Sequence, residues 1–210
     1  TNNSEVAALS RASEEDIRTA YQAIKNAKKP RLHTFIAVSP IHMERKLKMS
    51  SERVCETAVN AISQAHSLLG KKGIIEFSGE DSFRADREFL VKIYAAAIKA
   101  GADVINVPDT VGYAQPEEVF NLFAYLIKNV KGSDRVKWSF HGHNDLGNAV
   151  ANSMMAIRAG ASQIEGTING IGERAGNASL EEVLANIKTR PDYYFVQSSI
   201  DTTKIWYLSQ

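Results

Sequence analysis

Two histidines separated by a single residue, His141 and His143, are the side chains of this sequence best suited to binding a metal ion. They follow the apolar run 136–140, which is typical of a β-strand. Alternate residues of a strand project from the same face, so both imidazoles can bind one divalent cation. The competing interpretation is a chance pair of surface histidines. A polar, glycine-rich stretch at 169–177 follows the next predicted strand and favours the metal site.

The segments that must position these motifs alternate between apolar runs and amphipathic stretches. Strands are predicted over 32–38, 74–77, 103–107, 136–140 and 163–168, with 6–9 as the tail of a further strand. Helices are predicted over 17–24, 51–69, 85–100, 116–127 and 147–159, and a last helix begins at Ser179, with Glu182 completing a capping box. Strands and helices that alternate about every thirty residues form parallel βα units, here with polar motifs just after the strands. This spacing fits a barrel and a doubly wound sheet equally well.

The composition excludes several classes of partner. The 210 residues include 25 Lys and Arg against 24 Asp and Glu, which leaves a formal net charge of +1. We therefore expect no nucleic-acid partner and no polybasic contact with a membrane. No apolar run reaches the length of a membrane span. The lone Cys55 fits the reducing cytoplasm and is interpreted as a small hydrophobic residue rather than a nucleophile.

Further polar motifs precede the histidine pair. They are His33-Thr34-Phe35, Ser39-Pro40-Ile41-His42, Glu76-Phe77-Ser78-Gly79-Glu80-Asp81 and Pro108-Asp109-Thr110-Val111-Gly112. Together with 141–145 and 169–177, these motifs resemble, in the same order, the alpha-isopropylmalate synthase and homocitrate synthase family. The resemblance runs from about Ala7 to the C-terminus and is greatest to the 2-isopropylmalate synthases. Several motifs in the family's order are far more specific than any one of them alone.

The resemblance implies an α/β fold, a TIM (β/α)8 barrel, which needs eight strands and about 250 residues. We therefore expect an incomplete barrel that holds about five to six C-terminal βα units and lacks the N-terminal strands. The family's Arg-Asp-Gly motif, which supplies a metal ligand, does not occur in this sequence. Residues 1–195 are expected to be a partial catalytic domain, and 196–210 the start of a C-terminal linker. Exposed sheet edges predict self-association or marginal stability for such a fragment.

The resemblance also implies a metal site. His141 and His143 are the expected ligands, with Asn177 in or near the coordination shell. Imidazole and oxygen donors suit Mn²⁺, Mg²⁺ or Zn²⁺. The alternative for Asn177 is a turn or cap residue before the Ser179 helix.

Other polar residues of these loops are expected to hold backbone geometry. Asn144 and Asp145 are expected to fix the loop and the following helix through backbone hydrogen bonds. Glu173 and Arg174 are expected to pair and to hold the glycine-rich loop.

The family's acid–base glutamate matches Glu80. The competing interpretation is that Glu80 and its neighbour Asp81 cap the following helix. The hydroxyls of Ser78 and Thr110 are candidates for binding the substrate carboxylate, although Thr110 could also bond its own turn. His33 either faces the substrate or is a satisfied core residue.

Glu76 bears on the choice of substrate, because the related homocitrate synthases tend to place arginine there. A glutamate would repel a second carboxylate, which favours the monocarboxylic 3-methyl-2-oxobutanoate. The expected reaction is its condensation with acetyl-CoA to 2-isopropylmalate, the first step of leucine biosynthesis, in a cytoplasmic homodimer. The alternatives are a homocitrate or citramalate synthase, an HMG-CoA-lyase-type enzyme, or a catalytically incomplete fragment. We expect the chain by itself to be inactive.

Overall fold

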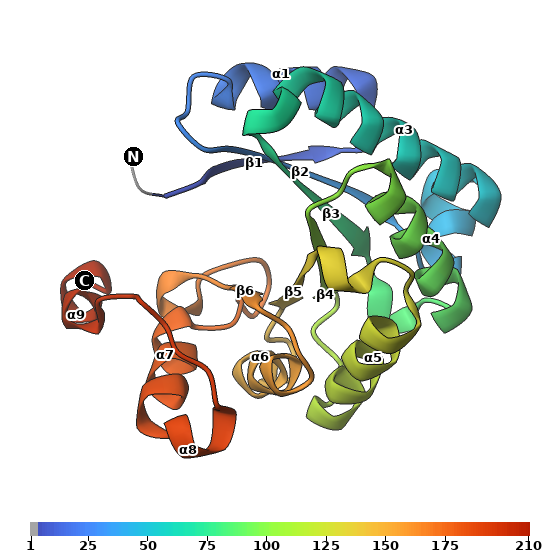
Figure 1. The fold of residues 1–210 in the computed structure, drawn as a ribbon. Coiled ribbons are helices and arrows are strands. Elements are labelled where there is room, and N and C mark those ends of the chain that lie inside the picture. The colour runs from blue at the N-terminus through green and yellow to red at the C-terminus, as the bar shows by residue number, and fades with distance from the viewer. Residues whose placement is uncertain (1–3) are drawn as a thin grey trace. The chain divides into compact units, whose positions relative to one another are not determined.

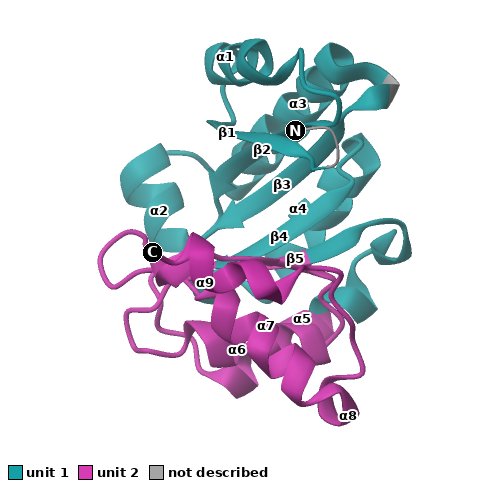
Figure 2. Cartoon of the chain, turned by 90° about the vertical axis from the view of Figure 1, so that its left-hand side faces the viewer, with its two compact units in different colours: residues 1–108, 126–138 teal, residues 109–125, 139–210 magenta. Residues whose placement is uncertain are grey.

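The computed structural model describes residues 4–210 and divides into two compact units. Unit 1 consists of residues 1–108 and 126–138, and unit 2 consists of 109–125 and 139–210 (Figure 2). Each unit is described by itself.

Unit 1 contains a parallel sheet. Its strands are β1 (Val6–Arg11), β2 (Pro30–Ala37), β3 (Ile74–Glu80) and β4 (Val104–Asp109). The register places Leu9, His33 and Glu76 beside one another, and Ser78 beside Asn106. The first residue of β5 (Lys137–Gly142) donates its backbone N–H to the carbonyl of Asp103. Register partners in parallel strands share a face, so the polar residues of β2 and β3 project from the same side of the sheet.

Three long helices cover one face of this sheet (Figure 1). They are α1 (Glu14–Ile24), α3 (Ser51–Leu69) and α4 (Arg87–Ala100). Each helix is capped at its N-terminus by a side chain that accepts a backbone N–H of the first turn. The capping residues are Ser13, Ser50 and Asp86, respectively. Helix α4 ends at Gly101 in the left-handed region, with φ of 111°. These residues account for the helix boundaries expected from the sequence.

Short helical segments occupy several connections of unit 1. They are α2 (Pro40–His42), the π-helix η1 (Met43–Leu47) and the 3-10 turns η2 (Gly70–Lys72), η3 (Ser82–Arg84) and η4 (Ser133–Arg135). The π-helix follows directly on α2 and ends at Lys48, which has φ of 54°. Single-turn π-helices are frequent at functional sites.

Unit 2 packs helices beside two parallel strands. Strand β5 pairs with β6 (Gln163–Glu165), and His141 lies opposite Glu165 in their register. The helical elements are α6 (Ala149–Arg158), η5 (Ile168–Gly170), α7 (Leu180–Thr189), α8 (Pro191–Tyr194), η6 (Thr202–Lys204) and α9 (Ile205–Leu208), and α5 (Pro116–Asn129) begins in unit 2 and ends in unit 1. Met154, Ile157, Val183 and Ile187 form the core between α6 and α7.

The expected strands and helices are present, and residues 6–9 belong to the true strand β1. The sheet has six strands, the upper end of the expected number. Several strand ends differ from expectation. Strands β3, β4 and β5 extend into the polar motifs as far as Glu80, Asp109 and Gly142, so part of the chemistry lies on strand ends rather than in loops. Strand β6, expected to reach residue 168, ends at Glu165.

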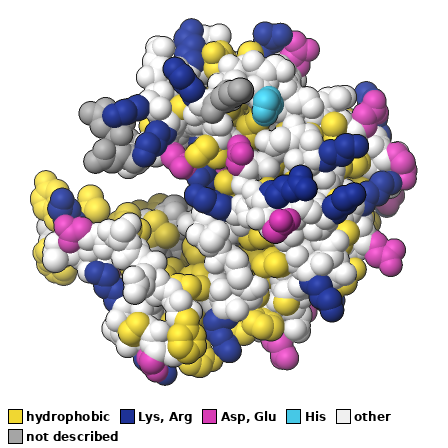
Figure 3. Space-filling model, in the orientation of Figure 1, with side chains coloured by type: hydrophobic (Ala, Val, Ile, Leu, Met, Phe, Trp, Pro, Cys, Tyr) yellow, Lys and Arg dark blue, Asp and Glu magenta, His cyan; other side chains and the backbone are white. Residues whose placement is uncertain are grey.

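The C-terminal segment of unit 2 exposes large apolar side chains (Figure 3). Phe195, Trp206 and Tyr207 are 86%, 76% and 82% exposed. The self-association expected of the chain stays a prediction. Within residues 4–210, no helix has both the length and the apolar character needed to cross a bilayer.

Candidate active site

The two histidines of the H-x-H motif face each other in unit 2. Their Nε2 atoms lie 3.3 Å apart, and the ring planes are inclined by 87°. Two imidazole nitrogens bound to one zinc-sized ion at about 2.0–2.1 Å, at an angle of about 90–110°, lie about 2.8–3.4 Å apart. The separation of His141 and His143 therefore fits shared coordination of one cation.

His143 is also held in the protonation state that binds metals. Burial lowers the pKa of His143, and the positive charge of Arg174 lowers it further. A neutral imidazole has a free lone pair for a cation, whereas an imidazolium has none.

Asn177 lies next to His143, because the two backbones form an isolated antiparallel bridge. Its amide nitrogen donates to the carbonyl of Ile171 at 3.0 Å, which fixes the orientation of the amide. Among residues 4–210, no hydrogen-bond partner reaches the buried Asn177 Oδ1 or the buried His143 Nδ1. The capping alternative for Asn177 is wrong, because Ser179 caps α7 by accepting from the Glu182 backbone N–H. A buried, oriented oxygen beside His143 fits a metal ligand.

The expected backbone bond is confirmed for Asn144, whereas Asp145 is held by a side-chain pair with Arg174. Asn144 Oδ1 accepts the backbone N–H of Ala149 in the first turn of α6 at 3.1 Å. Arg174 donates to both carboxylate oxygens of Asp145, at 2.7 and 2.8 Å, which lowers the pKa of Asp145. The expected pairing of Arg174 with Glu173 is the longer contact, at 3.5 Å.

Two acidic residues of unit 2 were not singled out from the sequence. Asp109 is fully buried, and its carboxylate accepts the backbone N–H groups of Tyr113 and Ala114 at 3.2 and 3.0 Å. Burial raises the pKa of Asp109, although these bonds favour its charged form. Glu165 accepts from the Ser139 hydroxyl at 2.9 Å. Both residues organise backbone or side chains near the histidines.

In unit 1, His33 and Ser78 are brought together as a pair. His33 Nε2 lies 2.5 Å from Ser78 Oγ, which also accepts from the side-chain amide of Asn106 at 3.0 Å. Burial lowers the pKa of His33, while the negative charge of Glu76 opposes that shift. A neutral His33 can orient the Ser78 hydroxyl.

Glu76 is paired with a buried arginine. Arg31 donates to Glu76 at 2.8 Å, the two side chains are only 10% and 3% exposed, and Arg31 also contacts Glu5. The Glu76 charge is therefore largely compensated, which weakens the repulsion of a second substrate carboxylate expected from the sequence. Arg31 and His33 project from the same face of β2, a spacing that could have identified Arg31.

Glu80, the last residue of β3, is held by a lysine from the π-helix. Lys46 Nζ lies 2.7 and 2.9 Å from the two carboxylate oxygens of Glu80. Its neighbour Asp81 accepts from Arg84. Helix α4 is capped by Asp86, so the interpretation of Glu80 and Asp81 as its caps is wrong. A cavity of about 320 Å³ adjoins Lys46 and Glu80 at the carboxyl ends of β1, β2 and β3.

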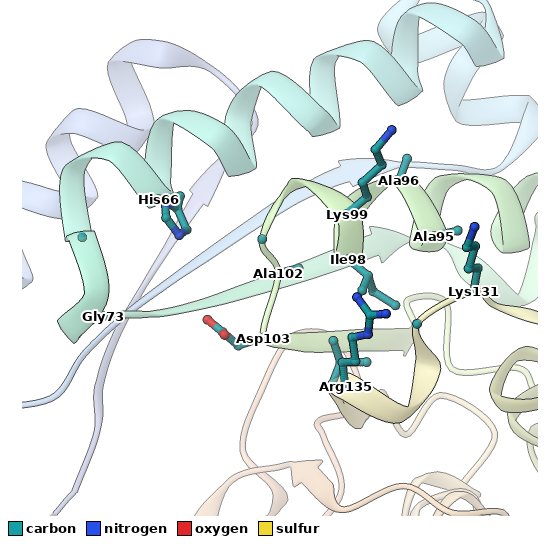
Figure 4. A pocket seen from close by; sticks show the side chains of 14 residues that line it. His66, Gly73, Ala95, Ala96, Ile98, Lys99, Ala102, Asp103, Lys131 and Arg135 are labelled. Atoms are coloured by element: carbon teal, nitrogen blue, oxygen red, sulfur yellow. The ribbon is translucent and has the colours of Figure 1, made fainter.

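A cavity of about 800 Å³ lies elsewhere in unit 1, where β3 and β4 begin (Figure 4). Lys99, Lys131 and Arg135 line it, together with Asp103, whose carboxylate accepts the Ile75 N–H at 2.9 Å. None of the predicted site residues lines this cavity. Amino-terminal edges of parallel barrel strands serve stability rather than chemistry.

A model of the family described as HMGL-like matches residues 1–210. The chain belongs to the HMGL-like family. It is 53% identical to a 2-isopropylmalate synthase of Lysinibacillus sphaericus over 208 residues, 99% of this chain and 40% of that protein. It is also 53% identical to a 2-isopropylmalate synthase of Pyrococcus abyssi, over 95% of this chain and 40% of that protein. This HMGL-like chain thus spans about 40% of the length of these curated relatives.

Solved structures of other HMGL-like proteins share the fold. A hydroxymethylglutaryl-CoA lyase of Pseudomonas aeruginosa matches with a TM-score of 0.77 and 17% identity, over 96% of this chain and 66% of that one. The carboxyl transferase domain of a Rhizobium etli pyruvate carboxylase matches with a TM-score of 0.69 and 17% identity, over 99% of this chain and 34% of that one. With its six parallel strands, the chain is an incomplete α/β barrel of the TIM type.

Proposed function

We propose that this HMGL-like chain is part of a 2-isopropylmalate synthase. The enzyme would condense acetyl-CoA with 3-methyl-2-oxobutanoate and water to give 2-isopropylmalate and CoA, at the start of leucine biosynthesis. The observation that carries the proposal is the identity of 53% to synthases of that name across almost the whole chain. The 17% identity to a hydroxymethylglutaryl-CoA lyase supports the shared fold alone.

His141, His143 and Asn177 would hold a divalent cation. The 3.3 Å separation of the imidazole nitrogens and the buried, oriented amide oxygen support this role. A bound Mn²⁺, Mg²⁺ or Zn²⁺ would supply Lewis-acid polarisation of the 2-oxo acid carbonyl.

Glu80 would accept the proton from the methyl group of the acetyl thioester. The resulting carbanion attacks the keto carbon of the oxo acid, and water then releases CoA from the thioester. A general base must reach its proton at hydrogen-bonding distance, which requires a fixed carboxylate. The two contacts from Lys46, at 2.7 and 2.9 Å, fix Glu80 at the carboxyl end of β3.

Ser78 and Thr110 would donate their hydroxyls to the substrate carboxylate. His33 and Asn106 support this role for Ser78, since both contact its oxygen and so limit its rotamers. Glu76 would lie beside the substrate, and its carboxylate holds Arg31 in place on the strand face. Charge compensation leaves the choice of oxo acid to the volume of the pocket, where one methylene changes discrimination by about 1–3 kcal/mol.

The test is CoA release from acetyl-CoA with 3-methyl-2-oxobutanoate, with and without Mn²⁺. The 210-residue chain is assayed beside the extended protein, meaning the chain with flanking sequence that gives it the length of its relatives. We expect Mn²⁺-dependent release in the extended protein and none in the chain alone. No release with this oxo acid, but release with pyruvate or 2-oxoglutarate, would replace the proposal with a citramalate or homocitrate synthase. A cytoplasmic location and a homodimer are both part of the proposal. Sedimentation of the extended protein tests the homodimer.

A further inference from the structure

Arg174 occupies a backbone conformation that arginine disfavours. Its φ is +53°, in the left-handed region, where a side chain other than glycine meets steric strain. Residues held in such a conformation cost about 1–3 kcal/mol and are concentrated at functional sites. Glycine would adopt this conformation freely, and Gly170, Gly172 and Gly176 stand in the same loop. The reason for arginine here must therefore lie in its side chain.

The Arg174 side chain connects three separate loops of unit 2. Its guanidinium donates two hydrogen bonds to Asp145, after β5, and a third to the carbonyl of Thr110, after β4, at 2.9 Å. The planar guanidinium matches a carboxylate in this two-bond geometry, which a lysine cannot reproduce. Asp145 is itself packed closely, because a Cβ added to Gly112 would lie 2.3 Å from its carboxylate oxygen.

Each of the three loops carries a residue of the proposed site. In the loop after β4, Thr110 itself accepts the bond from Arg174 through its carbonyl. In the other two loops, His143 lies two residues before Asp145, and Asn177 lies three residues after Arg174. Backbone bonds already join two of the loops, from Asn144 N to Gly176 O at 2.9 Å and from Ala178 N to Gly142 O at 3.0 Å. Two further backbone bonds join the Thr110 loop to the loop after β5, from His143 N to Asp109 O at 3.3 Å and from Leu146 N to Gly112 O at 3.1 Å. Arg174 adds a direct side-chain bond from the loop of Asn177 to Thr110.

We propose that Arg174 is a positioning residue that, anchored on Asp145, sets Thr110 against the metal ligands His143 and Asn177. The inference rests on the proposed function and adds a link between its metal site and its substrate site. It predicts that loss of the guanidinium disturbs metal and oxo-acid binding together. Partners one step removed from a metal typically change its affinity about 10- to 100-fold when mutated.

The deciding variant is Arg174→Gly in the extended protein. Glycine relieves the strained backbone, so we expect a thermal midpoint equal to or above that of the unchanged protein. We also expect Mn²⁺ affinity, measured by the EPR signal of free Mn²⁺, to fall about tenfold or more. The KM for the oxo acid should rise more than kcat falls. Arg174→Lys should restore little of the Mn²⁺ affinity or of the KM for the oxo acid, because lysine lacks the planar guanidinium that bonds both carboxylate oxygens. The matched control is Arg190→Lys, which changes the exposed Arg190–Asp192 pair of the same unit.

The outcomes separate this inference from the proposed function. If Arg174→Gly binds Mn²⁺ as tightly as the unchanged protein, the positioning role is overturned whatever the enzyme's substrate. If Arg174→Gly loses affinity only because it unfolds, its thermal midpoint falls, and the strain argument is overturned. If the extended protein binds Mn²⁺ but releases no CoA, the proposed reaction is wrong. The effect of Arg174→Gly on Mn²⁺ affinity, measured by EPR, still tests the positioning of the metal ligands. A protein that binds no Mn²⁺ at all overturns both proposals.

Discussion

Two groups of polar side chains differ in how their polar atoms are paired. The strand face of unit 1 consists of Arg31, His33, Glu76 and Ser78, and the loop cluster of unit 2 consists of His141, His143 and Asn177. On β2 and β3, His33 bonds Ser78, and Arg31 bonds Glu76, so these side chains pair with one another across the strands. In unit 2, the Nε2 atoms of His141 and His143 face each other, and no hydrogen-bond partner within residues 4–210 reaches the buried Asn177 Oδ1. A buried polar atom without a partner costs about 1–3 kcal/mol, and an ion bound at this oxygen would offset that cost. The pairing in unit 1 suits the proposed substrate binding and proton transfer, and the open oxygen in unit 2 suits the proposed ion.

The largest expected effect is on catalysis and comes from unit 1. Glu80→Gln in the extended protein should lower kcat by about 10²–10⁴-fold, since a positioned general base contributes that much. Mn²⁺ affinity should not change, because the ligands are in unit 2. The measurement is steady-state CoA release beside a Mn²⁺ titration, with the exposed Glu88→Gln as control. A kcat within a factor of three of the unchanged enzyme would remove Glu80 from the acid–base role.

The second effect is on ion binding and comes from unit 2. His141→Ala should weaken Mn²⁺ binding by more than about 100-fold, beyond the range for groups that only support a ligand. The free energy of unfolding in metal-free buffer should change little. His66→Ala, an exposed histidine on α3, is the control in EPR titrations and urea unfolding. Equal losses of Mn²⁺ affinity in both variants would show that His141 is not a ligand.

The third effect is on stability and separates a buried pair from a surface pair. Glu76→Gln removes the charge that Arg31 faces in the interior, while the contact of Arg31 with Glu5 remains. We expect a loss of about 1–3 kcal/mol in the free energy of unfolding, the range for a weakened charged hydrogen bond in the interior.

The matched control is Glu14→Gln, which breaks the exposed pair with Arg18 and should cost less than about 1 kcal/mol. Urea unfolding of the extended protein measures both variants. Equal losses would mean that the strand face of unit 1 is not the completed network described here.

The smallest effect is a pH dependence of stability. Burial lowers the pKa of His33 below its ordinary value of 6.5. Between the two pKa values the unfolded chain binds more protons than the folded chain, so stability is lost as the pH falls below about 6.5. The loss is at most about 1.4 kcal/mol for each unit of pH. His33→Gln should reduce the difference between urea midpoints at pH 7.5 and 5.5, whereas His66→Gln should not. An unchanged difference in His33→Gln would mean that this group does not titrate as inferred.

Local patterns predicted most of the fold. Ser13 and Ser179 cap the helices expected to begin there, and Gly101 ends α4 as expected. These boundaries depend on residues close in sequence, whose preferences act without the rest of the chain. The short β6 was misjudged, because its apolar pattern continues into the irregular stretch before η5.

Side-chain partners far apart in sequence were the least predictable part of the site. Lys46 lies 34 residues from Glu80 and reaches it from a π-helix, which no periodic pattern indicates. Arg174 and Asp145 lie 29 residues apart in two different loops, so the sequence predicted the adjacent Glu173 as the partner of Arg174 instead. The motifs supplied the candidate residues, and the structure supplied their partners.

The most direct test of the account is pulsed EPR of Mn²⁺ bound to the extended protein, with histidine labelled by ¹⁵N. The account predicts coupling of the ion to two histidine nitrogens, lost when His141 and His143 are both replaced by alanine. Tight Mn²⁺ binding without any nitrogen coupling, unchanged by the double replacement, would contradict it and move the ion away from the loop cluster of unit 2.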